Sequence, residues 1–238
     1  MAGGCCDGWH PRNGRPGFVS SGGARVSGRG WFITFEGIDG AGKSTQVDRM
    51  CERLRESSVR VTRTREPGGT PIGDRIRGLL LDPASSMHLV TEAYLYAASR
   101  AEHVRSVIRP GLADGALVIS DRFVEASMAY QAEGELTVGR IAKLNEIALD
   151  GLEPDLTILI DLPVVRARER LMRTGNAADR LERRDDLYFE RVRGRLLQIA
   201  AAHPNRVFVF DGEMDPAELH EAIWRQVKTR VGIIREER

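Results

Sequence analysis

The sequence has few cysteines, no long apolar run and almost no net charge, and each of these absences argues against a class of protein. Its three cysteines, Cys5, Cys6 and Cys51, lack paired C-x-x-C spacing, which argues against a disulfide framework and a structural zinc site. We therefore expect reduced thiols in a cytoplasmic protein. No apolar run approaches the ~20 residues that a membrane-spanning helix requires. The net charge of +1 gives no global reason to expect a nucleic-acid partner or an anionic membrane.

Residues 1–30 are rich in glycine, arginine and serine, and they lack the apolar core of a secretory signal. We predict a disordered leader here, from an upstream start site or an added extension. Contact of this basic leader with RNA or anionic lipid is the less favoured alternative. Residues 31–238 are predicted to form one kinase-sized domain, because this length and an apolar content of 42% suffice for a full core.

Apolar runs and helical spacing alternate along the chain. Short continuous apolar runs are typical of strands covered on both faces, whereas apolar residues three and four apart predict amphipathic helices. We expect strands at 31–37, 59–64, 116–120, 156–161 and 206–211. We expect helices at 43–56, through 76–80, and at 89–108, 126–131, 137–148, 164–172, 187–201 and 216–231, with Pro110 ending the longest. This alternation predicts a three-layer α/β sandwich, with a five-stranded, mostly parallel sheet and helices on both faces.

The segment from Gly37 to Ser44 reads G-I-D-G-A-G-K-S and lies between a predicted strand and helix, which is the full context of a P-loop. Its glycines let several backbone N–H groups point at one phosphate, and the following helix adds the positive end of its dipole. Lys43 can reach the β- and γ-phosphates, and the Ser44 hydroxyl can hold Mg²⁺. The alternative, a glycine-rich turn with a solvated lysine, does not account for this context. We therefore expect a bound nucleoside triphosphate.

A P-loop alone does not distinguish a GTPase, a motor ATPase and a small-molecule kinase. The sequence contains no N-K-x-D motif for reading guanine and has no room for the additional parts of a motor. These two observations favour a small-molecule kinase.

Four further segments make this assignment more specific. They are TREPGGTPIGDRIR (64–77), YLYAASRAEH (94–103), DRFVEASMAYQ (121–131) and RTGNAADRLERRDD (173–186). Together with the P-loop, these segments resemble the bacterial thymidylate kinases in their order, spacing and residue identities, from about Trp31 to the C-terminus. The resemblance implies a P-loop nucleoside-monophosphate kinase fold, a homodimer, and Mg²⁺-assisted transfer of the γ-phosphoryl group of ATP to dTMP. It also implies that the arginine-rich stretch, about 173–186, is a short mobile LID.

The resemblance assigns residues to each substrate. The ATP-binding residues would be Gly37, Ile38, Asp39, Gly40, Ala41, Gly42, Lys43, Ser44, Thr45 and Arg180. The dTMP-binding residues would be Asp39, Glu66, Arg77, Tyr96, Arg100, Arg122, Ser127, Tyr130 and Gln131. Ser44 and Asp121 would hold the metal ion, and the catalytic groups would be Lys43, Arg180, Arg122 and Asp39.

Tyr96 and Arg100 are four residues apart and therefore share one face of a predicted helix. An aromatic ring beside a cation can stack on a base and donate to its carbonyl edge. In the family, the matching aromatic residue stacks on thymine and the matching arginine meets its O4. This chain has Tyr96 where phenylalanine is commoner, which keeps the stacking and adds a hydroxyl group. An amphipathic core helix with a snorkelling arginine is the alternative.

Asp121 ends a predicted strand, where α/β sheets place their ligands, and Arg122 beside it offers a planar fork for a phosphate. By resemblance, Arg122 holds the phosphate of dTMP. Ser127 and Gln131 would face thymine, and Tyr130 would crowd the 2′ position and so select deoxyribose. A strand-end ion pair is the alternative for Arg122, and ordinary helix packing is the alternative for Tyr130.

Asp39 is a carboxylate inside a phosphate loop, which suits anion binding only if the side chain faces away from the triphosphate. The resemblance places it on the 3′-hydroxyl of the acceptor sugar. It also places Glu66 and Arg77 near the acceptor phosphate, with a solvated helix charge as the alternative for Arg77.

The acceptor phosphate is already ionised near neutral pH, so catalysis requires positioned cations rather than a general base. One branch of the family carries a catalytic arginine inside the P-loop, where this chain has Gly40. We therefore expect the cation to come from the LID, whose candidates are Arg173, Arg180, Arg183 and Arg184. The D-R-L-E context favours Arg180. A solvated helix face paired with nearby acids is the alternative, and it holds for one or two of these arginines.

Two other functions compete with thymidylate kinase. One is a kinase of another nucleotide, such as a deoxynucleoside, CMP/UMP or AMP kinase, because the choice of base depends on the resemblance. The other is a catalytically silent nucleotide-binding module on the same fold. The presence of Lys43, Ser44, Asp121, Arg122 and the LID arginines argues against the silent module.

Overall fold

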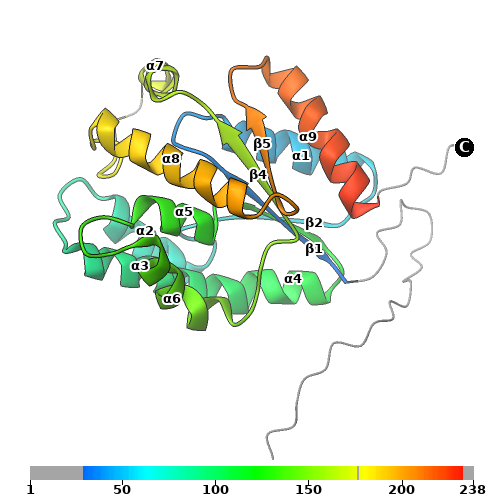
Figure 1. Cartoon of the computed structure of the whole chain (residues 1–238). Coiled ribbons are helices and arrows are strands. Elements are labelled where there is room, and N and C mark those ends of the chain that lie inside the picture. Colours follow the sequence, from blue (N-terminus) through cyan, green and yellow to red (C-terminus); the bar gives the residue numbers. More distant parts are fainter. Residues whose placement is uncertain (1–28, 176, 233–238) are drawn as a thin grey trace, which may run out of the picture.

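The computed structural model describes residues 29–175 and 177–232, so residues 1–28 of the predicted leader lie outside the described residues. The strands are β1 (Trp31–Glu36), β2 (Val61–Arg65), β3 (Leu117–Asp121), β4 (Leu156–Asp161) and β5 (Val207–Asp211). The helices are α1 (Lys43–Glu56), α2 (Pro71–Leu81), α3 (Leu89–His103), η1 (Val104–Ile108), α4 (Arg109–Ala113), α5 (Val124–Tyr130), α6 (Val138–Leu149), α7 (Val164–Thr174), α8 (Asp186–Ala202) and α9 (Pro216–Val231). Figure 1 shows their arrangement.

The five strands form one sheet in the order β2-β3-β1-β4-β5, and every neighbouring pair is parallel. This confirms the predicted α/β fold with a parallel sheet. From β1 the chain first builds β2 and β3 on one side and later crosses to β4 and β5 on the other. The carboxyl end of β1 is therefore the switch point at which open α/β sheets bind their ligands.

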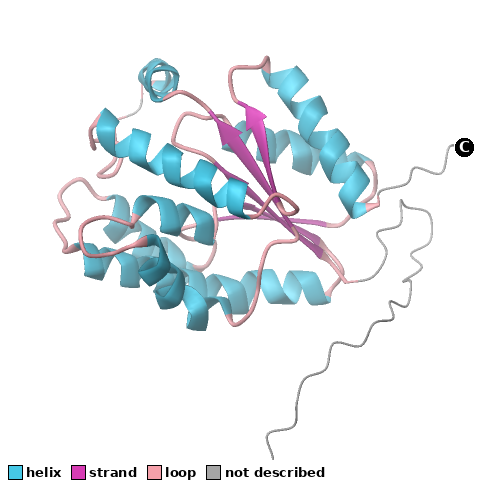
Figure 2. Cartoon of the chain, in the orientation of Figure 1, coloured by secondary structure: helices cyan, strands magenta, loops and turns pink. Residues whose placement is uncertain are grey.

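Helices cover both faces of the sheet, so the molecule has three layers (Figures 1 and 2). On one face, α1 packs against β1, β2 and β3 and also against α9, which packs on β5. On the other face, α4 packs on β3 and α8 packs on β4 and β5. The helices α2, α3 and α6 join this second layer, because α3 contacts both α2 and α6. None of the helices in 29–175 and 177–232 is long and apolar enough to cross a membrane.

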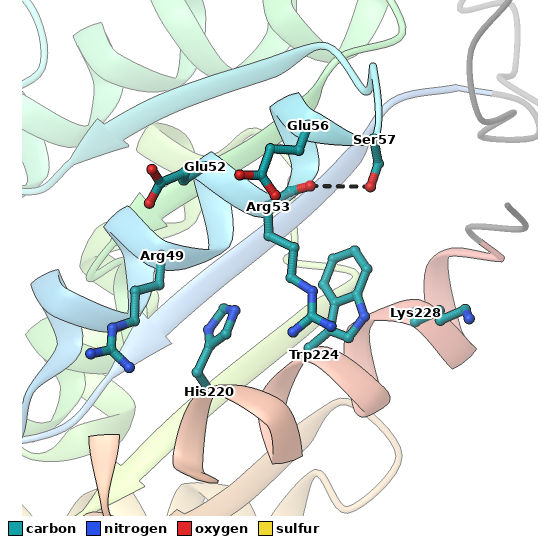
Figure 3. Close-up of a pocket in the computed structure, with 8 residues that line it drawn as sticks. All are labelled: Arg49, Glu52, Arg53, Glu56, Ser57, His220, Trp224 and Lys228. Atoms are coloured by element: carbon teal, nitrogen blue, oxygen red, sulfur yellow. Dashed lines mark hydrogen bonds between the residues drawn. The ribbon is translucent and has the colours of Figure 1, made fainter. Parts of the chain in front are cut away.

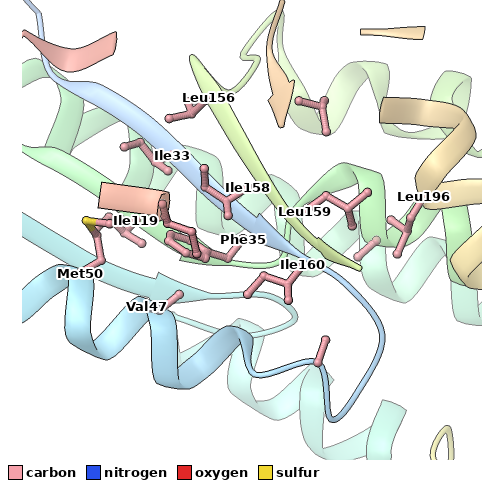
Figure 4. Packing of buried hydrophobic residues seen from close by; sticks show 14 of the residues in the cluster. Ile33, Phe35, Val47, Met50, Ile119, Leu156, Ile158, Leu159, Ile160 and Leu196 are labelled. Carbon is pink, nitrogen blue, oxygen red and sulfur yellow. The ribbon is translucent and has the colours of Figure 1, made fainter. Parts of the chain in front are cut away.

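The main core lies between the sheet and the helices around it (Figure 4). Phe35 of β1 and Ile158 of β4 are fully buried, and Val47 and Met50 of α1 pack against the same cluster. Burying an apolar side chain of this size stabilises a fold by about 1.5–3 kcal/mol. The core therefore holds β1 and the start of α1 in fixed positions, and these two elements carry the P-loop.

Several predicted boundaries differ from the structure, and two of these differences have a clear physical reason. The prediction that Pro110 ends the long helix is wrong, because α3 continues through the π-helical turn η1 into α4, which contains this proline. In the wide turn, the N–H of Arg109 donates to the carbonyl of Val104. Pro110 lies directly after this wide turn, where the pattern of backbone hydrogen bonds changes from π-helical to α-helical. The second strand begins at Val61 rather than at Val59. The backbone N–H of Val59 instead donates to the carbonyl of Leu54 at the C-terminal end of α1.

Candidate active site

The P-loop lies between β1 and α1 and forms an anion-binding site. Gly42 precedes α1 with a left-handed φ of 99°, which residues with side chains rarely adopt. The first turn of α1 has neither a side-chain cap nor an acidic residue, so its backbone N–H groups remain for an anionic ligand. The buried Lys43 donates from Nζ to the carbonyl of Ile38 at 2.9 Å. Burial, and then the neighbouring Arg122, lower the pKa of Lys43.

A cavity of about 610 Å³ opens over the P-loop. Its basic lining residues are Lys43, Arg63, Arg65, Arg77, Arg122 and Arg170, and its acidic ones are Asp39, Glu66, Asp121 and Glu182. The C-terminal part of the chain contributes four lining residues without charged side chains: Gly212, Met214, Pro216 and Leu219. The excess of basic groups suits a polyphosphate, and the less charged end suits a planar base. We call this the donor cavity.

Most of the predicted ATP-binding residues line the donor cavity, namely Asp39, Gly40, Ala41, Gly42, Lys43, Ser44 and Thr45. Gly37 and Ile38 lie beneath the loop instead. A side chain at Gly37 would come within 2.5 Å of the carbonyl oxygen of Ile160, and Ile38 is buried in the main core. Gly37 and Ile38 therefore shape the P-loop rather than line the cavity.

A second, narrower pocket of about 70 Å³ lies beside the donor cavity. Its lining includes all nine predicted dTMP-binding residues: Asp39, Glu66, Arg77, Tyr96, Arg100, Arg122, Ser127, Tyr130 and Gln131. Asp179 and Leu181 of the predicted LID also line it. We call it the acceptor pocket.

Asp39, Arg122 and Tyr130 form a bonded cluster in the wall of the acceptor pocket. Arg122 donates from Nη2 to Asp39 Oδ1 at 2.7 Å and to the Tyr130 hydroxyl at 3.0 Å. The Tyr130 hydroxyl donates to Asp39 Oδ2 at 3.2 Å. Burial alone would raise the pKa of Asp39, but Arg122 and Lys43 outweigh it and lower the pKa to about 2. The aspartate is therefore ionised at neutral pH.

Arg100 has a more enclosed position than its predicted base contact suggested, because only 1% of its surface is exposed. Its Nε donates to Glu66 Oε2 at 2.8 Å, and its Nη2 donates to Ser127 Oγ and to the carbonyl of Phe123, both at 3.0 Å. His103, on the same helix, lies 2.9 Å from Glu66 Oε1 through Nδ1. The prediction did not include His103, whose spacing of three residues from Arg100 could have suggested a shared partner.

Ser44 and Asp121 lie together at the head of α1. The Ser44 hydroxyl donates to Asp121 Oδ2 at 2.6 Å, although the two residues are 77 positions apart. Parallel pairing of β1 with β3 places Phe35 opposite Asp121 and so brings the strand end to the P-loop. A hydroxyl and a carboxylate oxygen in contact are hard ligands of the type that Mg²⁺ prefers, so the residues present fit this ion.

The structure places Arg180 away from the donor cavity. Its Nε donates to the carbonyl of Leu80, and its Nη2 donates to Glu92 at 2.7 Å. Only 13% of its side chain is exposed. Arg180 therefore ties the LID to α2 and α3 in this conformation, and its catalytic role remains a prediction that requires this contact to break.

Arg170 of α7 is a cation of the donor cavity that the sequence interpretation missed. It donates from Nη2 to the carbonyl of Gly212 at 2.8 Å, and its Nη1 lies 4.0 Å from the position of a Cβ on Gly42. The carbonyl of Ala167, one turn earlier on α7, lies 2.5 Å from a Cβ built on Gly40. A P-loop arginine in place of Gly40 is therefore sterically excluded here. No signal in the sequence singled out Arg170, because α7 carries several arginines.

A separate groove of about 540 Å³ lies between α1 and α9 (Figure 3). Arg53 stacks over the ring of Trp224 at 4.5 Å and pairs with Glu221 at 2.5 Å. Arg49, His220 and Lys228 also border it, together with acidic groups of α1. The groove has neither a glycine-rich loop nor a free helix N-terminus, so it does not compete with the donor cavity as the active site.

Comparisons with known proteins agree with this geometry. The family model for thymidylate kinase matches residues 35–223. The chain is 48% identical over 199 residues to the thymidylate kinase of Symbiobacterium thermophilum, covering 83% of this chain and 92% of that protein. It is 50% identical over 190 residues to that of Geobacter sulfurreducens, covering 77% and 89%. The crystal structure of thymidylate kinase from Ehrlichia chaffeensis matches with a TM-score of 0.68 and 32% identity, covering 84% and 99%. The chain therefore belongs to the thymidylate kinase family.

Proposed function

We propose that this chain transfers the γ-phosphoryl group of ATP to dTMP, giving ADP and dTDP. One observation carries this proposal: the donor cavity and the acceptor pocket share a wall made of Asp39, Glu66, Arg77 and Arg122. A phosphoryl group at the P-loop and an acceptor phosphate at Arg122 would then meet across this wall. Direct transfer between two bound nucleotides requires such a junction.

In this mechanism, Arg122 holds the phosphate of dTMP through its planar fork. Neighbouring Asp39 keeps the guanidinium charged, since it raises the pKa of Arg122 despite its burial. The ionised Asp39 would accept a hydrogen bond from the 3′-hydroxyl of the acceptor sugar. Tyr130 bonds to both residues, and in this mechanism it would crowd a 2′-hydroxyl of the acceptor sugar.

Ser44 and Asp121 would hold Mg²⁺, and the bound ion would offset negative charge on the phosphates of ATP. The remaining positive charge comes from Lys43 and from arginines above the loop. Arg170 already lies beside the donor cavity. Arg180 would add a second cation if the LID closed over ATP and released Glu92.

We also infer a homodimer in the cytoplasm, with no nucleic-acid or membrane partner. Large exposed apolar side chains on α3 and α6 support the dimer, because Tyr94 is 62% exposed and Ile147 is 85% exposed. Light scattering on the full chain tests it, and a monomer at micromolar concentration contradicts it.

The test of the function is ADP release with ATP and Mg²⁺ against a panel of dTMP, dUMP, UMP, CMP, AMP and GMP. A strong preference for dTMP supports the proposal. Preference for another base would identify a related nucleotide kinase. Retained ATP binding without turnover would identify a silent nucleotide-binding module.

A further inference from the structure

Glu36 is a buried carboxyl group that borders neither the donor cavity nor the acceptor pocket. It is the last residue of β1, directly before the P-loop, and only 1% of its surface is exposed. Its Oε1 accepts a hydrogen bond from the backbone N–H of Phe123 at 2.7 Å. This contact joins the strand that carries the P-loop to the chain that follows β3, across 87 positions of sequence.

The residue before Phe123 has an unusual backbone conformation. Arg122 has a φ of 73°, in the left-handed region that residues with side chains rarely adopt. Its N–H donates to the carbonyl of Phe35 at 2.9 Å, and its carbonyl accepts from the Ser120 hydroxyl at 2.7 Å. Together with the bond from Phe123 to Glu36, these contacts hold the turn from both sides. Such strain persists only where the surroundings enforce it.

We propose that Glu36 is a positioning residue for the acceptor substrate: its hydrogen bond to Phe123 holds the left-handed turn that directs Arg122 at the acceptor phosphate. This inference rests on the proposed function, because it assigns that phosphate to Arg122. Without the bond, the turn can relax toward an ordinary conformation, and the guanidinium then leaves its position beside Asp39 and Tyr130.

The surroundings show why this position is costly for a carboxyl group. Glu36 Oε2 and Glu125 Oε2 are both buried, and within the described part of the chain neither has a hydrogen-bond partner. Burial, and then the charge of Glu125, raise the pKa of Glu36. An apolar residue would avoid both costs, so packing alone does not explain a carboxyl group here. The neutral carboxyl keeps the acceptor for Phe123 and does not compete with Asp39 for Arg122.

The experiment compares Glu36→Leu and Glu36→Gln with the wild-type full chain in the ATP–dTMP assay. We expect Glu36→Leu to raise the KM for dTMP about tenfold while the KM for ATP stays within about twofold, because in the proposed mechanism Arg122 holds the acceptor phosphate whereas the backbone N–H groups of the P-loop and Lys43 hold ATP. Glu36→Gln keeps an oxygen for Phe123 and should restore both values to within about twofold of wild type. If the leucine variant does not fold, Glu36→Asp is the alternative, because its side chain is one methylene shorter and no longer reaches the N–H of Phe123. This variant should also raise the KM for dTMP.

Thr34→Val is the matched control, because Thr34 is a buried polar residue of the same strand that bonds to Thr157 rather than to the turn. It should lower thermal stability without changing either KM. An unchanged KM for dTMP in both Glu36→Leu and Glu36→Asp would overturn the proposal, as would equal rises in both KM values. Failure of the proposed function is recognised separately, since wild type itself would then not use dTMP.

Discussion

Burial of Glu36 makes a quantitative prediction about stability that does not depend on the substrate. The pKa of this carboxyl group is raised from 4.5 to about 8, first by burial and then by Glu125 of α5. Arg122 and Lys43 face the same group and oppose the rise without cancelling it. Between these two pH values the folded protein holds a proton that the unfolded chain releases. The free energy of unfolding therefore falls as pH rises through this window.

The size of the effect follows from the two pKa values. Each pH unit inside the window should cost about 1.4 kcal/mol, and the accumulated loss at pH 7 is about 3 kcal/mol. Glu36→Gln cannot ionise and removes this loss. We expect the variant to match wild type near pH 4 and to become progressively more stable than wild type as pH rises, until the difference levels off above about pH 8.

Reversible urea unfolding at several pH values from 4 to 9 measures this difference directly, and Thr34→Val provides a control from the same strand. Because Thr34 does not titrate, its variant should keep the wild-type slope at a lower overall stability. A difference between Glu36→Gln and wild type that stays constant with pH would refute the reasoning. It would mean that water or a rearrangement of Glu125 keeps Glu36 ionised in the folded protein.

Four further variants test substrate binding and catalysis. Lys43→Ala should abolish turnover while circular dichroism shows an intact fold, and normal turnover would contradict the P-loop assignment. Arg180→Ala should lower kcat by about 10³ with a smaller change in the KM for dTMP, whereas Arg170→Ala should raise the KM for ATP about tenfold. Steady-state kinetics separates the two arginines, and an unchanged kcat would remove Arg180 from the mechanism. Tyr130→Phe should relax the preference for dTMP over its ribonucleotide by about tenfold in kcat/KM, and an unaltered ratio would assign the hydroxyl a packing role.

Much of the fold was predictable because its signals are local. The helix at Lys43–Glu56, the strand at Leu156–Asp161 and the helix at Pro216–Val231 have the predicted bounds. The two helices have apolar residues at helical spacing, and the strand is a continuous apolar run that follows a turn-rich segment. The region around Pro110 was not predictable in this way, because a π-helical turn depends on how the helix packs rather than on which residues it contains.

The candidate active site also combines features that are local in the sequence with features that depend on tertiary packing. The sequence by itself determined the motifs and the groups predicted to carry the chemistry, because the glycines of the P-loop, Lys43 and Arg122 belong to motifs of contiguous residues. Only the tertiary structure decided which groups meet. Parallel pairing of β1 with β3 brought Asp121 to Ser44, and the packing of α7 on the P-loop placed Arg170 near Gly42. Burial at a strand end likewise gave Glu36 its raised pKa. Distance and dielectric environment arise from packing between distant segments, and no local pattern of residues contains them.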